Sequence, residues 1–473
     1  MVKQSVQSKI KKVQIKTAHL TNYYHENSGG VSTSLNNLLA EAERSRRQVR
    51  LIVPGERFQI KQVNEYGKIY YVPARRSPVF DRRYRLIMPW QYVLKNSVVR
   101  RILSDEKPDI IEVTDKYTLS FIGAMLHRGF FSSLGRPVLV HFSAERMDDN
   151  IASYLTGNKV GKLFANLFMA NYILPSFDFH IANSQYTAQE FFEAYEKASE
   201  FSGWLLKKSH KFFKAPSIPL QERIFVCPRG VDTKFYNPSR KNAEFRKKIN
   251  QDLGLSETAK LLLYSGRISP EKNIELLPEL MKILCADEKD FRLLVAGSGP
   301  KRDWLIKQSE LFPQRKIILL GHLDKETLAN YYANVDVFIH PNPKEPFGNV
   351  VLEAMASGIP VVVPNAGGVL TCANSENAWV VEPTPQEFAK AVKTVVEGEE
   401  LAKLKISKAL ETVAENSVEK AVSRLFATYD RIYEIFHSRF SAESTRESID
   451  SVKKFAVGCL IGLIGIERCL NWF

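Results

Sequence analysis

Short apolar runs recur along the chain, separated by longer stretches in which apolar residues return every three or four positions. The runs are rich in Val, Ile and Leu, which is typical of strands buried on both faces of a parallel sheet. The longer stretches have the period of amphipathic helices. The runs that predict strands are IKTAHL, VRLIVP, DIIEVT, PVLVHF, FHIAN, KLLLYSG, RLLVAG, KIILLG, DVFIHP and PVVVP. We therefore predict an α/β fold.

The series of strands and helices occurs twice. A break falls at residues 226–238, where three Pro and Gly residues interrupt the pattern. The chain has 473 residues, more than one hydrophobic core usually supports. We expect two doubly wound, Rossmann-like domains, residues 1–225 and 226–416, which face each other across a central cleft at the carboxyl ends of their strands.

The C-terminal part has a different pattern. Residues 417–437 space their apolar side chains at helical intervals and predict a long amphipathic helix. Residues 438–473 contain a polar linker and then an apolar run, 455–466. This run is shorter than the roughly 20 residues that cross a bilayer. It either lies in a membrane interface as an anchor or packs as a terminal helix on protein.

The composition indicates a globular protein in a reducing compartment. Hydrophobic residues make up 44% and charged residues 25%, close to the average soluble domain. The five cysteines are scattered, with no C-x-x-C pair and no metal-ligand spacing with histidine. No apolar run of signal-peptide length occurs near the start. We expect a cytoplasmic protein with reduced thiols.

Positive charge is concentrated in the first half of the chain. The net charge is +14; residues 1–230 hold 34 Lys and Arg against 20 Asp and Glu, and the remainder holds 32 of each. The asymmetry is consistent with an anionic partner of the first domain, such as a membrane surface or a phosphorylated acceptor. A basic surface that only maintains solubility explains it equally well. We expect no nucleic-acid partner, because no single-strand motif or groove-reading helix is evident.

The stretch HPNPKEPFGNVVLEAMASGIPVVVPNAGGV carries the clearest chemistry. A strand ends in a Pro-rich loop, and a helix begins at about Gly348. The backbone N–H groups of Gly348, Asn349 and Val350 would then form the N-terminus of a helix, which binds phosphate groups well. We include the adjacent Phe347 among the candidate donor-binding residues. The stretch predicts a site for a diphosphate.

Charged residues surround this predicted site. Glu345 precedes the helix and Glu353 lies about one turn inside it. Ionised carboxylates accept strong hydrogen bonds, so the pair could bracket a nucleotide-sugar. Arg267 and Lys272 follow the first strand of the second domain and could stabilise a departing nucleoside diphosphate. No convincing D-x-D pair is present, so we expect no metal and no other cofactor.

These residues resemble a known family. EPFGNVVLEAMASG resembles the E-x7-E signature of retaining glycosyltransferases with the GT-B fold, and GRISPEKN resembles their R-x4-K element. VAGSGP and LGHLDKETLANYYANVDVFIHP lie between them, so nearly the whole second domain is similar to family 4 of the glycosyltransferases, group 1. The resemblance implies transfer of a hexose from a UDP-hexose or GDP-mannose to a lipid-linked or saccharide acceptor, without a metal.

The resemblance also implies roles for the second-domain residues. Glu353 would bind the ribose, and Arg267 and Lys272 would hold the diphosphate. Glu345 would contact the donor sugar near the reacting carbon. The acceptor hydroxyl would attack the face that the leaving group departs from, with the phosphate taking the proton. No protein nucleophile is then required.

The first domain resembles the family more loosely. Gly29 and Gly30, in HENSGGVSTS, match the family's glycine loop and would let the backbone approach the donor phosphates, although a tight turn explains them equally well. His141 ends a strand where family members keep a histidine that contacts the donor sugar, so we treat it as a candidate catalytic residue. A histidine after a strand is more often structural.

Three weaker candidates lie on the acceptor side. Glu145 and Arg146, in HFSAERMDD, and Asp115, in IIEVTDKYTL, resemble positions in mannosyl- and glucosyltransferases that act on lipid acceptors. Residues 197–219 depart from the compact family pattern. Their Lys and aromatic side chains could contact a membrane or a charged acceptor, or could form an ordinary basic loop.

Taken together, the sequence predicts a hexosyltransferase that is peripheral on the inner face of the membrane, with the donor held by the second domain and a glycolipid or saccharide acceptor by the first. Two alternatives share the fold. One is a nucleotide-sugar 2-epimerase, which would convert the donor without an acceptor. The other is a non-catalytic protein that binds a sugar nucleotide, which would neither transfer nor hydrolyse it.

Overall fold

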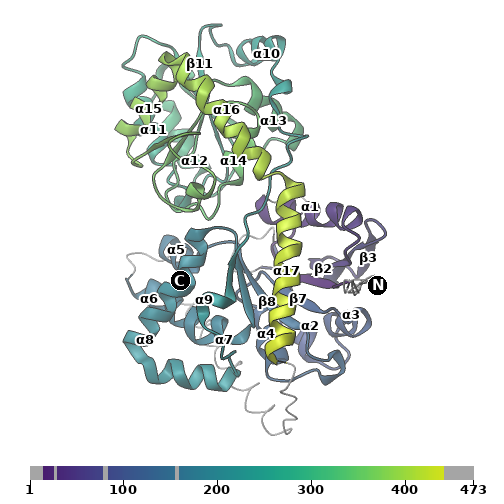
Figure 1. Ribbon diagram of the computed structural model, residues 1–473. Coiled ribbons are helices and arrows are strands. Elements are labelled where there is room, and N and C mark those ends of the chain that lie inside the picture. Colours follow the sequence, from purple (N-terminus) through teal and green to yellow (C-terminus); the bar gives the residue numbers. More distant parts are fainter. Residues whose placement is uncertain (1–13, 26–28, 78–83, 155–158, 441–473) are drawn as a thin grey trace, which may run out of the picture.

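The first half of the chain folds around a large β-sheet (Figure 1). The structure is a computed structural model and describes residues 14–25, 29–77, 84–154 and 159–440. Among these residues, eight strands form the sheet, and neighbouring strands run parallel except for β3 and β4. In spatial order they are β10 (Ile224–Val226), β9 (Phe179–Ala182), β8 (Val138–Ser143), β7 (Ile110–Val113), β1 (Thr17–Leu20), β2 (Val49–Gly55), β4 (Gly67–Pro73) and β3 (Gln59–Gln62).

The second half of the chain contains a separate, fully parallel sheet. Its described strands are, in spatial order, β13 (Ile317–Gly321), β12 (Phe291–Ala296), β11 (Lys260–Ser265), β14 (Val337–Ile339), β15 (Val361–Pro364) and β16 (Trp379–Val381). β5 (Arg75–Arg76) and β6 (Arg85–Leu86) form a separate antiparallel pair next to β2. The apolar runs of the sequence coincide with β1, β2, β7–β9 and β11–β15, so the predicted strands are confirmed.

Helices cover both faces of the first sheet. One face packs against helices α3, α4, α7 and α8, and the other packs against α1 and α17. The helices of the first half are α1 (Gly30–Arg44), α2 (Trp90–Val93), α3 (Val98–Glu106), α4 (Ser120–His127), α5 (Met147–Tyr154), α6 (Lys159–Phe168), α7 (Leu174–Ser176), α8 (Gln185–Phe213) and α9 (Leu220–Arg223). A π-helical turn, η2 (Met169–Ile173), joins α6 to α7.

The second sheet is also covered on both faces. Helices α10, α13, α14 and α16 pack on one face, and α11, α12 and α15 pack on the other. The helices of the second half are α10 (Ala243–Leu253), α11 (Leu276–Leu284), α12 (Arg302–Glu310), α13 (Lys325–Asn334), α14 (Asn349–Ala356), α15 (Pro385–Glu397), α16 (Glu399–Glu415) and α17 (Val418–Phe440). Two doubly wound domains result, which confirms the predicted fold class.

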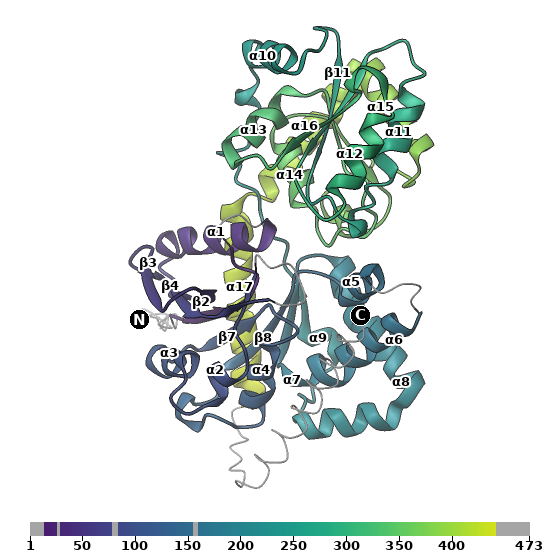
Figure 2. The same cartoon turned by 180° about the vertical axis from the view of Figure 1, so that it is seen from behind.

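The last helix returns to the first domain (Figures 1 and 2). Two crossing segments connect the domains and pair with each other, since Val231 N–H donates to the Asn416 carbonyl at 2.9 Å and Val418 N–H donates to the Val231 carbonyl at 3.0 Å. Buried side chains of α17, such as Leu425 and Tyr429, belong to the first domain's core. The domain boundary that the sequence suggests, between residues 225 and 226, falls inside β10, one residue before the strand ends at Val226.

No helix in the described part of the chain is both long and apolar enough to span a bilayer. Residues 441–473 lie outside the described residues. They include the apolar run 455–466, which the sequence suggests as a membrane-interface anchor.

Candidate functional site

A cleft of about 380 Å³ lies between the domains, at the carboxyl ends of both sheets. Ten of the fourteen candidate residues line this cleft. His141, Asp115, Val350 and Glu353 are not among its lining residues. Those that line it are Gly29, Gly30, Glu145, Arg146, Arg267, Lys272, Glu345, Phe347, Gly348 and Asn349.

Two helix N-termini face each other in this cleft. Helix α14 begins after Gly348, whose φ of 100° favours glycine, and α1 begins after Gly29. Within the described residues, no side chain caps either helix. A Cβ atom on Gly30 would lie 2.4 Å from Nδ2 of Asn349. The absence of a side chain on Gly30 therefore lets the two helix ends approach, and both attract anions.

Glu345 and Lys272 form an ion pair in the cleft. Lys272 Nζ lies 2.8 Å from Glu345 Oε2, Asn342 Nδ2 donates to the same oxygen at 3.2 Å, and His340 Nε2 lies 3.5 Å away. Burial alone would raise the pKa of Glu345, but the charge of Lys272 and the proximity of His340 lower it to about 2. Glu345 is therefore an ionised acceptor, as the predicted role requires.

Glu353 has the opposite electrostatic environment. It lies on α14 behind the cleft lining, where the Tyr332 hydroxyl donates to its Oε2 at 3.2 Å. Burial raises the pKa of Glu353 to about 7, although hydrogen bonds from Tyr332 and Tyr236 and the charge of Lys325 oppose that rise. Near neutral pH Glu345 is ionised, whereas Glu353 is partly protonated. The contact of Glu353 with a ribose stays a prediction.

A pair of glycines supports the loop that carries Glu345. Gly368 N–H donates to the Glu345 carbonyl at 2.6 Å, and a Cβ on Gly368 would lie 1.9 Å from the Pro346 carbonyl oxygen. Gly367 adopts a φ of 88°, which favours glycine. Any side chain here would displace the loop. These glycines were not predicted as site residues, although they stand in the same NAGGV motif.

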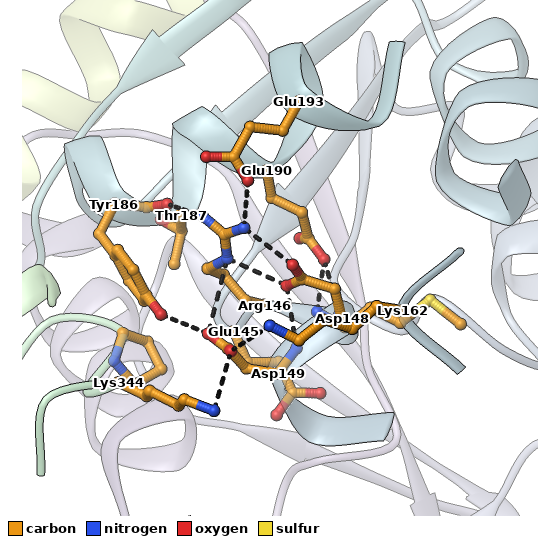
Figure 3. Close-up of polar contacts among 12 residues, drawn as sticks. Glu145, Arg146, Asp148, Asp149, Lys162, Tyr186, Thr187, Glu190, Glu193 and Lys344 are labelled. Carbon is orange, nitrogen blue, oxygen red and sulfur yellow. Dashed lines mark hydrogen bonds and ion pairs between the residues drawn. The ribbon is translucent and has the colours of Figure 1, made fainter. Parts of the chain in front are cut away.

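Arg146 is the centre of a polar cluster at the first-domain side of the cleft (Figure 3). Its guanidinium donates to both carboxylate oxygens of Asp148, at 3.0 and 2.9 Å, and to Glu193 at 2.6 Å. Burial would lower the pKa of Arg146, but Asp148 and Glu193 raise it. The carbonyl of Glu145 accepts a hydrogen bond from Lys116 at 2.6 Å. Arg146 is therefore held rigidly as a cation.

Two polar contacts cross the cleft beside this cluster. Lys344 Nζ lies 3.5 Å from Oδ1 of Asp149, and the other carboxylate oxygen, Oδ2, accepts a hydrogen bond from the Tyr186 hydroxyl (Figure 3). The Ser184 hydroxyl donates to the Pro346 carbonyl at 2.5 Å. The loop that carries Glu345 therefore contacts the first domain directly. Neither contact was predicted from the sequence. The position of Lys344 next to Glu345 was the one signal that could have indicated a role for it at the site.

Arg229 is a further cation that was not predicted. It lines the cleft, its guanidinium stacks on the Phe142 ring at 4.0 Å, and it lies 3.7 Å from Oε1 of Glu112. Buried Glu112 also accepts a hydrogen bond from Tyr429 of α17 at 2.5 Å. Arg229 is thereby held against Phe142 of β8 and Glu112 of β7. Its place in the Pro- and Gly-rich linker was the only sequence signal.

The expected position of His141 requires a correction. Successive side chains of a strand point to opposite faces, and in β8 it is Phe142 that faces the cleft. His141 is fully buried on the other face, with its ring 5.5 Å from that of Phe177 and 5.8 Å from that of Phe191. Burial lowers the pKa of His141 well below its usual value. The structure does not bring this side chain to the donor site.

Asp115 is not among the residues that line the cleft, although the adjacent Thr114 is. Its buried carboxylate accepts hydrogen bonds from the backbone N–H groups of Tyr117 at 3.0 Å and Leu119 at 2.8 Å. Burial raises the pKa of Asp115, and these hydrogen bonds oppose the rise. The residue stabilises the turn before α4, and its role on the acceptor side stays a prediction. Among the described residues, no group of three or more His, Cys, Asp and Glu is placed to hold a metal ion.

Two family models match the chain. The model described as glycosyl transferases group 1 matches residues 245–411, which form most of the second domain. The model described as glycosyl transferase 4-like domain matches residues 29–199, within the first domain. Together the matches cover both sides of the cleft.

Curated relatives span most of the chain. A GDP-mannose-dependent alpha-(1-6)-phosphatidylinositol dimannoside mannosyltransferase of Mycobacterium tuberculosis is 27% identical over 383 residues, 81% of this chain and 88% of that protein. A GDP-mannose-dependent alpha-mannosyltransferase of Corynebacterium glutamicum is 25% identical over 350 residues, 74% of this chain and 72% of that protein.

A solved structure has the same fold. Anabaena HepE, crystallised with UDP and glucose, superposes with a TM-score of 0.61 over 88% of this chain and 100% of that chain. The two sequences are 17% identical. At this level the similarity concerns the fold alone.

Proposed function

The chain belongs to the group 1 glycosyltransferases, and we propose that it transfers mannose from GDP-mannose to a lipid-linked acceptor, with retention of anomeric configuration and without a metal. One observation carries the proposal. The ion pair of Lys272 and Glu345 lies in the cleft where the uncapped N-termini of α14 and α1 meet. This arrangement offers positive potential for a diphosphate beside an ionised acceptor for sugar hydroxyls.

The donor diphosphate would bind at the N-terminus of α14. Lys272 and Arg267 supply positive charge from the second domain, and Arg229 supplies it from the linker. Negative charge accumulates on the diphosphate as the glycosidic bond breaks, so fixed cations and helix dipoles stabilise the transition state. These groups would act in place of a metal ion. GDP-mannose is favoured as the donor because both relatives described above are named as GDP-mannose-dependent.

Glu345 would position the mannose. Its carboxylate is ionised and can accept hydrogen bonds from sugar hydroxyls. In the proposed reaction, the acceptor hydroxyl approaches the face of the sugar from which GDP departs. A new bond forms between the acceptor oxygen and the sugar carbon, the bond to the diphosphate breaks, and a diphosphate oxygen takes the hydroxyl proton. Contacts across the cleft would exclude water, which competes with the acceptor.

The acceptor would enter from the first-domain side. Glu145, Arg146 and Asp149 line the cleft there, opposite the donor residues. A lipid-linked acceptor is favoured because one relative is named for a phosphatidylinositol dimannoside. We also propose that the protein works at the anionic inner face of the cytoplasmic membrane, to which the basic first half would be attracted.

The experiment uses purified full-length protein and labelled donors. GDP-mannose, UDP-glucose and UDP-N-acetylglucosamine are each incubated with detergent-solubilised phosphatidylinositol dimannoside, with and without a chelator. We expect labelled lipid from GDP-mannose alone, insensitive to the chelator, with an α-linkage by NMR. Glu345→Ala should abolish formation of the labelled lipid. The control Glu310→Ala, at an exposed position of α12, should form as much labelled lipid as the wild type.

The other outcomes distinguish the alternatives. Conversion of the donor to its 2-epimer without an acceptor would indicate an epimerase. Donor binding without transfer or hydrolysis would indicate a non-catalytic binding protein. The named relatives are transferases, which favours transfer over both. Transfer from a UDP-sugar in place of GDP-mannose would overturn the donor assignment while leaving the reaction class intact.

A further inference from the structure

The second half of α8 has a fixed orientation on the first domain. The helix kinks at Ser202, whose φ of −157° and ψ of 64° are not helical, and then continues to its end at Phe213. Leu206 and Phe213 are buried against the domain, and the Ser209 hydroxyl donates to Oδ1 of Asn171 at 3.1 Å. The opposite face of this segment therefore points outward.

The outward face is unusually apolar. Trp204 is 64% exposed, Phe201 63%, Phe212 43% and Leu205 39%. Single exposed apolar residues are common on protein surfaces, but several large ones gathered on one short segment usually mark an interaction site. These four side chains lie within a dozen residues of sequence. All four keep a large part of their surface exposed, although the Arg128 guanidinium lies 4.5 Å from the centre of the Phe212 ring.

Lysines accompany these apolar residues. Lys207, Lys208 and Lys211 are exposed, and residues 203–214 contain no Asp or Glu. Lys208 Nζ lies 5.0 Å from the centre of the Trp204 ring. Residues 197–219, which the sequence left open as a basic loop, are therefore largely an amphipathic helix with a positive and apolar outer face.

Helix α6 extends this surface. It packs against α8 and carries Val160, 78% exposed, and Phe164, 50% exposed, one turn apart on the same face. Its only charged residues are Lys159 and Lys162. The combined α6–α8 face consists of Val160, Phe164, Phe201, Trp204, Leu205 and Phe212 with the adjacent lysines.

The helices of this face lead toward the cleft. Helices α8, α6 and α5 follow one another from the outer edge of the first domain toward the second domain (Figures 1 and 2). Helix α5 contacts α6, and its residues Asp149 and Asn150 line the cleft. A surface bound to the α6–α8 face would therefore lie beside the acceptor side of the cleft.

We propose that the α6–α8 face docks on an anionic lipid bilayer. The inference rests on the proposed function, because a lipid-linked acceptor resides in a bilayer. The amino-acid composition of the face favours a lipid bilayer over a protein partner. Lysine is depleted in protein–protein interfaces, whereas Trp, Phe and Lys together are typical of helices that lie in a membrane interface. The lysines meet the anionic headgroups while the apolar side chains enter the acyl boundary, which brings the cleft to the acceptor.

The test is co-sedimentation of the full-length protein with vesicles. Phosphatidylcholine vesicles with and without phosphatidylglycerol are compared for the wild type and two double variants, Phe201→Ser with Trp204→Ser and Lys207→Glu with Lys208→Glu. Matched controls change exposed residues of the second domain, namely Leu311→Ser with Leu404→Ser and Lys247→Glu with Lys248→Glu. Since every protein retains residues 441–473, a difference between variants reports on the α6–α8 face.

We expect the α6–α8 variants to bind phosphatidylglycerol vesicles about tenfold or more weakly than the wild type and the controls. Equal binding by all variants would overturn the proposal. Light scattering that shows a dimer broken by the α6–α8 variants would also overturn it, in favour of a second copy as the occupant. Transfer to detergent-solubilised acceptor should be unchanged in these variants. If the wild type itself transferred no sugar to the detergent-solubilised acceptor, this result would count against the proposed function and not against the docking surface.

Discussion

Lys272 Nζ lies 2.8 Å from Oε2 of Glu345, so two motifs 73 residues apart in sequence meet as one ion pair. Lys272 follows β11 and Glu345 follows β14, and these strands are parallel neighbours in the second sheet. Their carboxyl ends therefore deliver both side chains to the same edge. In the proposed reaction, the pair would place a cation for the leaving diphosphate beside an acceptor for the sugar.

Removing the lysine should cost both stability and activity. Lys272→Ala leaves the buried carboxylate of Glu345 without its cation, so we expect the free energy of unfolding to fall by about 2 kcal/mol and transfer to be lost. Denaturant unfolding and a transfer assay measure the two effects. The double variant Lys272→Ala with Glu345→Gln removes the unpaired charge and should regain much of the stability but none of the activity. Additive stability losses in the two single variants would contradict the pairing.

Glu353 should make stability depend on pH near neutrality. The pKa of its carboxyl rises from 4.5 in the unfolded chain to about 7 in the fold. Between these values the folded protein keeps a proton that the unfolded chain releases, so the stabilisation present below about pH 4.5 is lost as pH rises toward 7. Glu353→Gln escapes this loss. Its free energy of unfolding should exceed that of the wild type by about 3 kcal/mol at pH 8, with a much smaller difference near pH 4.

Chemical denaturation of both proteins across this range checks the prediction. Glu310→Gln, at an exposed position on α12, is the matched control and should follow the wild type at every pH. A difference between Glu353→Gln and the wild type that stays constant with pH would show that Glu353 does not titrate in this window.

Gly368 should tolerate no side chain. A Cβ atom there would lie 1.9 Å from the Pro346 carbonyl oxygen, which also accepts the hydrogen bond of Ser184 across the cleft. Gly368→Ala should therefore displace the loop of Glu345, lower the melting temperature and reduce transfer about a hundredfold. Gly203→Ala, where nothing lies within 4 Å of the added Cβ, should leave both unchanged. Comparable effects of the two substitutions would exclude the proposed contact.

The pair of Lys344 and Asp149 should couple the two domains. The ion pair is 3.5 Å long and partly exposed, so its contribution to the free energy of unfolding is modest. Lys344→Ala and Asp149→Asn should each raise the KM for the acceptor a few-fold, with a smaller effect on kcat. The double variant should be no worse than either single variant if the two residues act through each other. Fully additive effects would show that each residue acts on its own.

The strands and the second-domain site were predictable because local patterns determine them. A run such as Leu261–Leu263 is buried on both faces, so its apolar composition alone indicates a parallel strand. The convergence of Lys272 and Glu345 follows from the order of strands in a doubly wound sheet. The glycines that support the Glu345 loop carry a weaker signal, because a tight turn explains them equally well.

Other features depend on information that local patterns lack. Period-two alternation separates His141 from Phe142 but does not say which face of β8 meets the cleft, so the wrong side chain was expected there. The Lys344 to Asp149 contact depends on how the domains face each other. The extent of α8 was obscured by Ser202 and Gly203, which interrupt its pattern where the helix kinks.

We infer that the donor diphosphate binds between Lys272 and the N-terminus of α14. Calorimetric titration of GDP-mannose into the wild type, Lys272→Ala and the control Lys307→Ala, with and without a chelator, tests it most directly. We predict that binding is insensitive to the chelator, weakens about tenfold or more in Lys272→Ala and is unchanged in the control. Equal affinity of the wild type and Lys272→Ala for GDP-mannose would contradict the account.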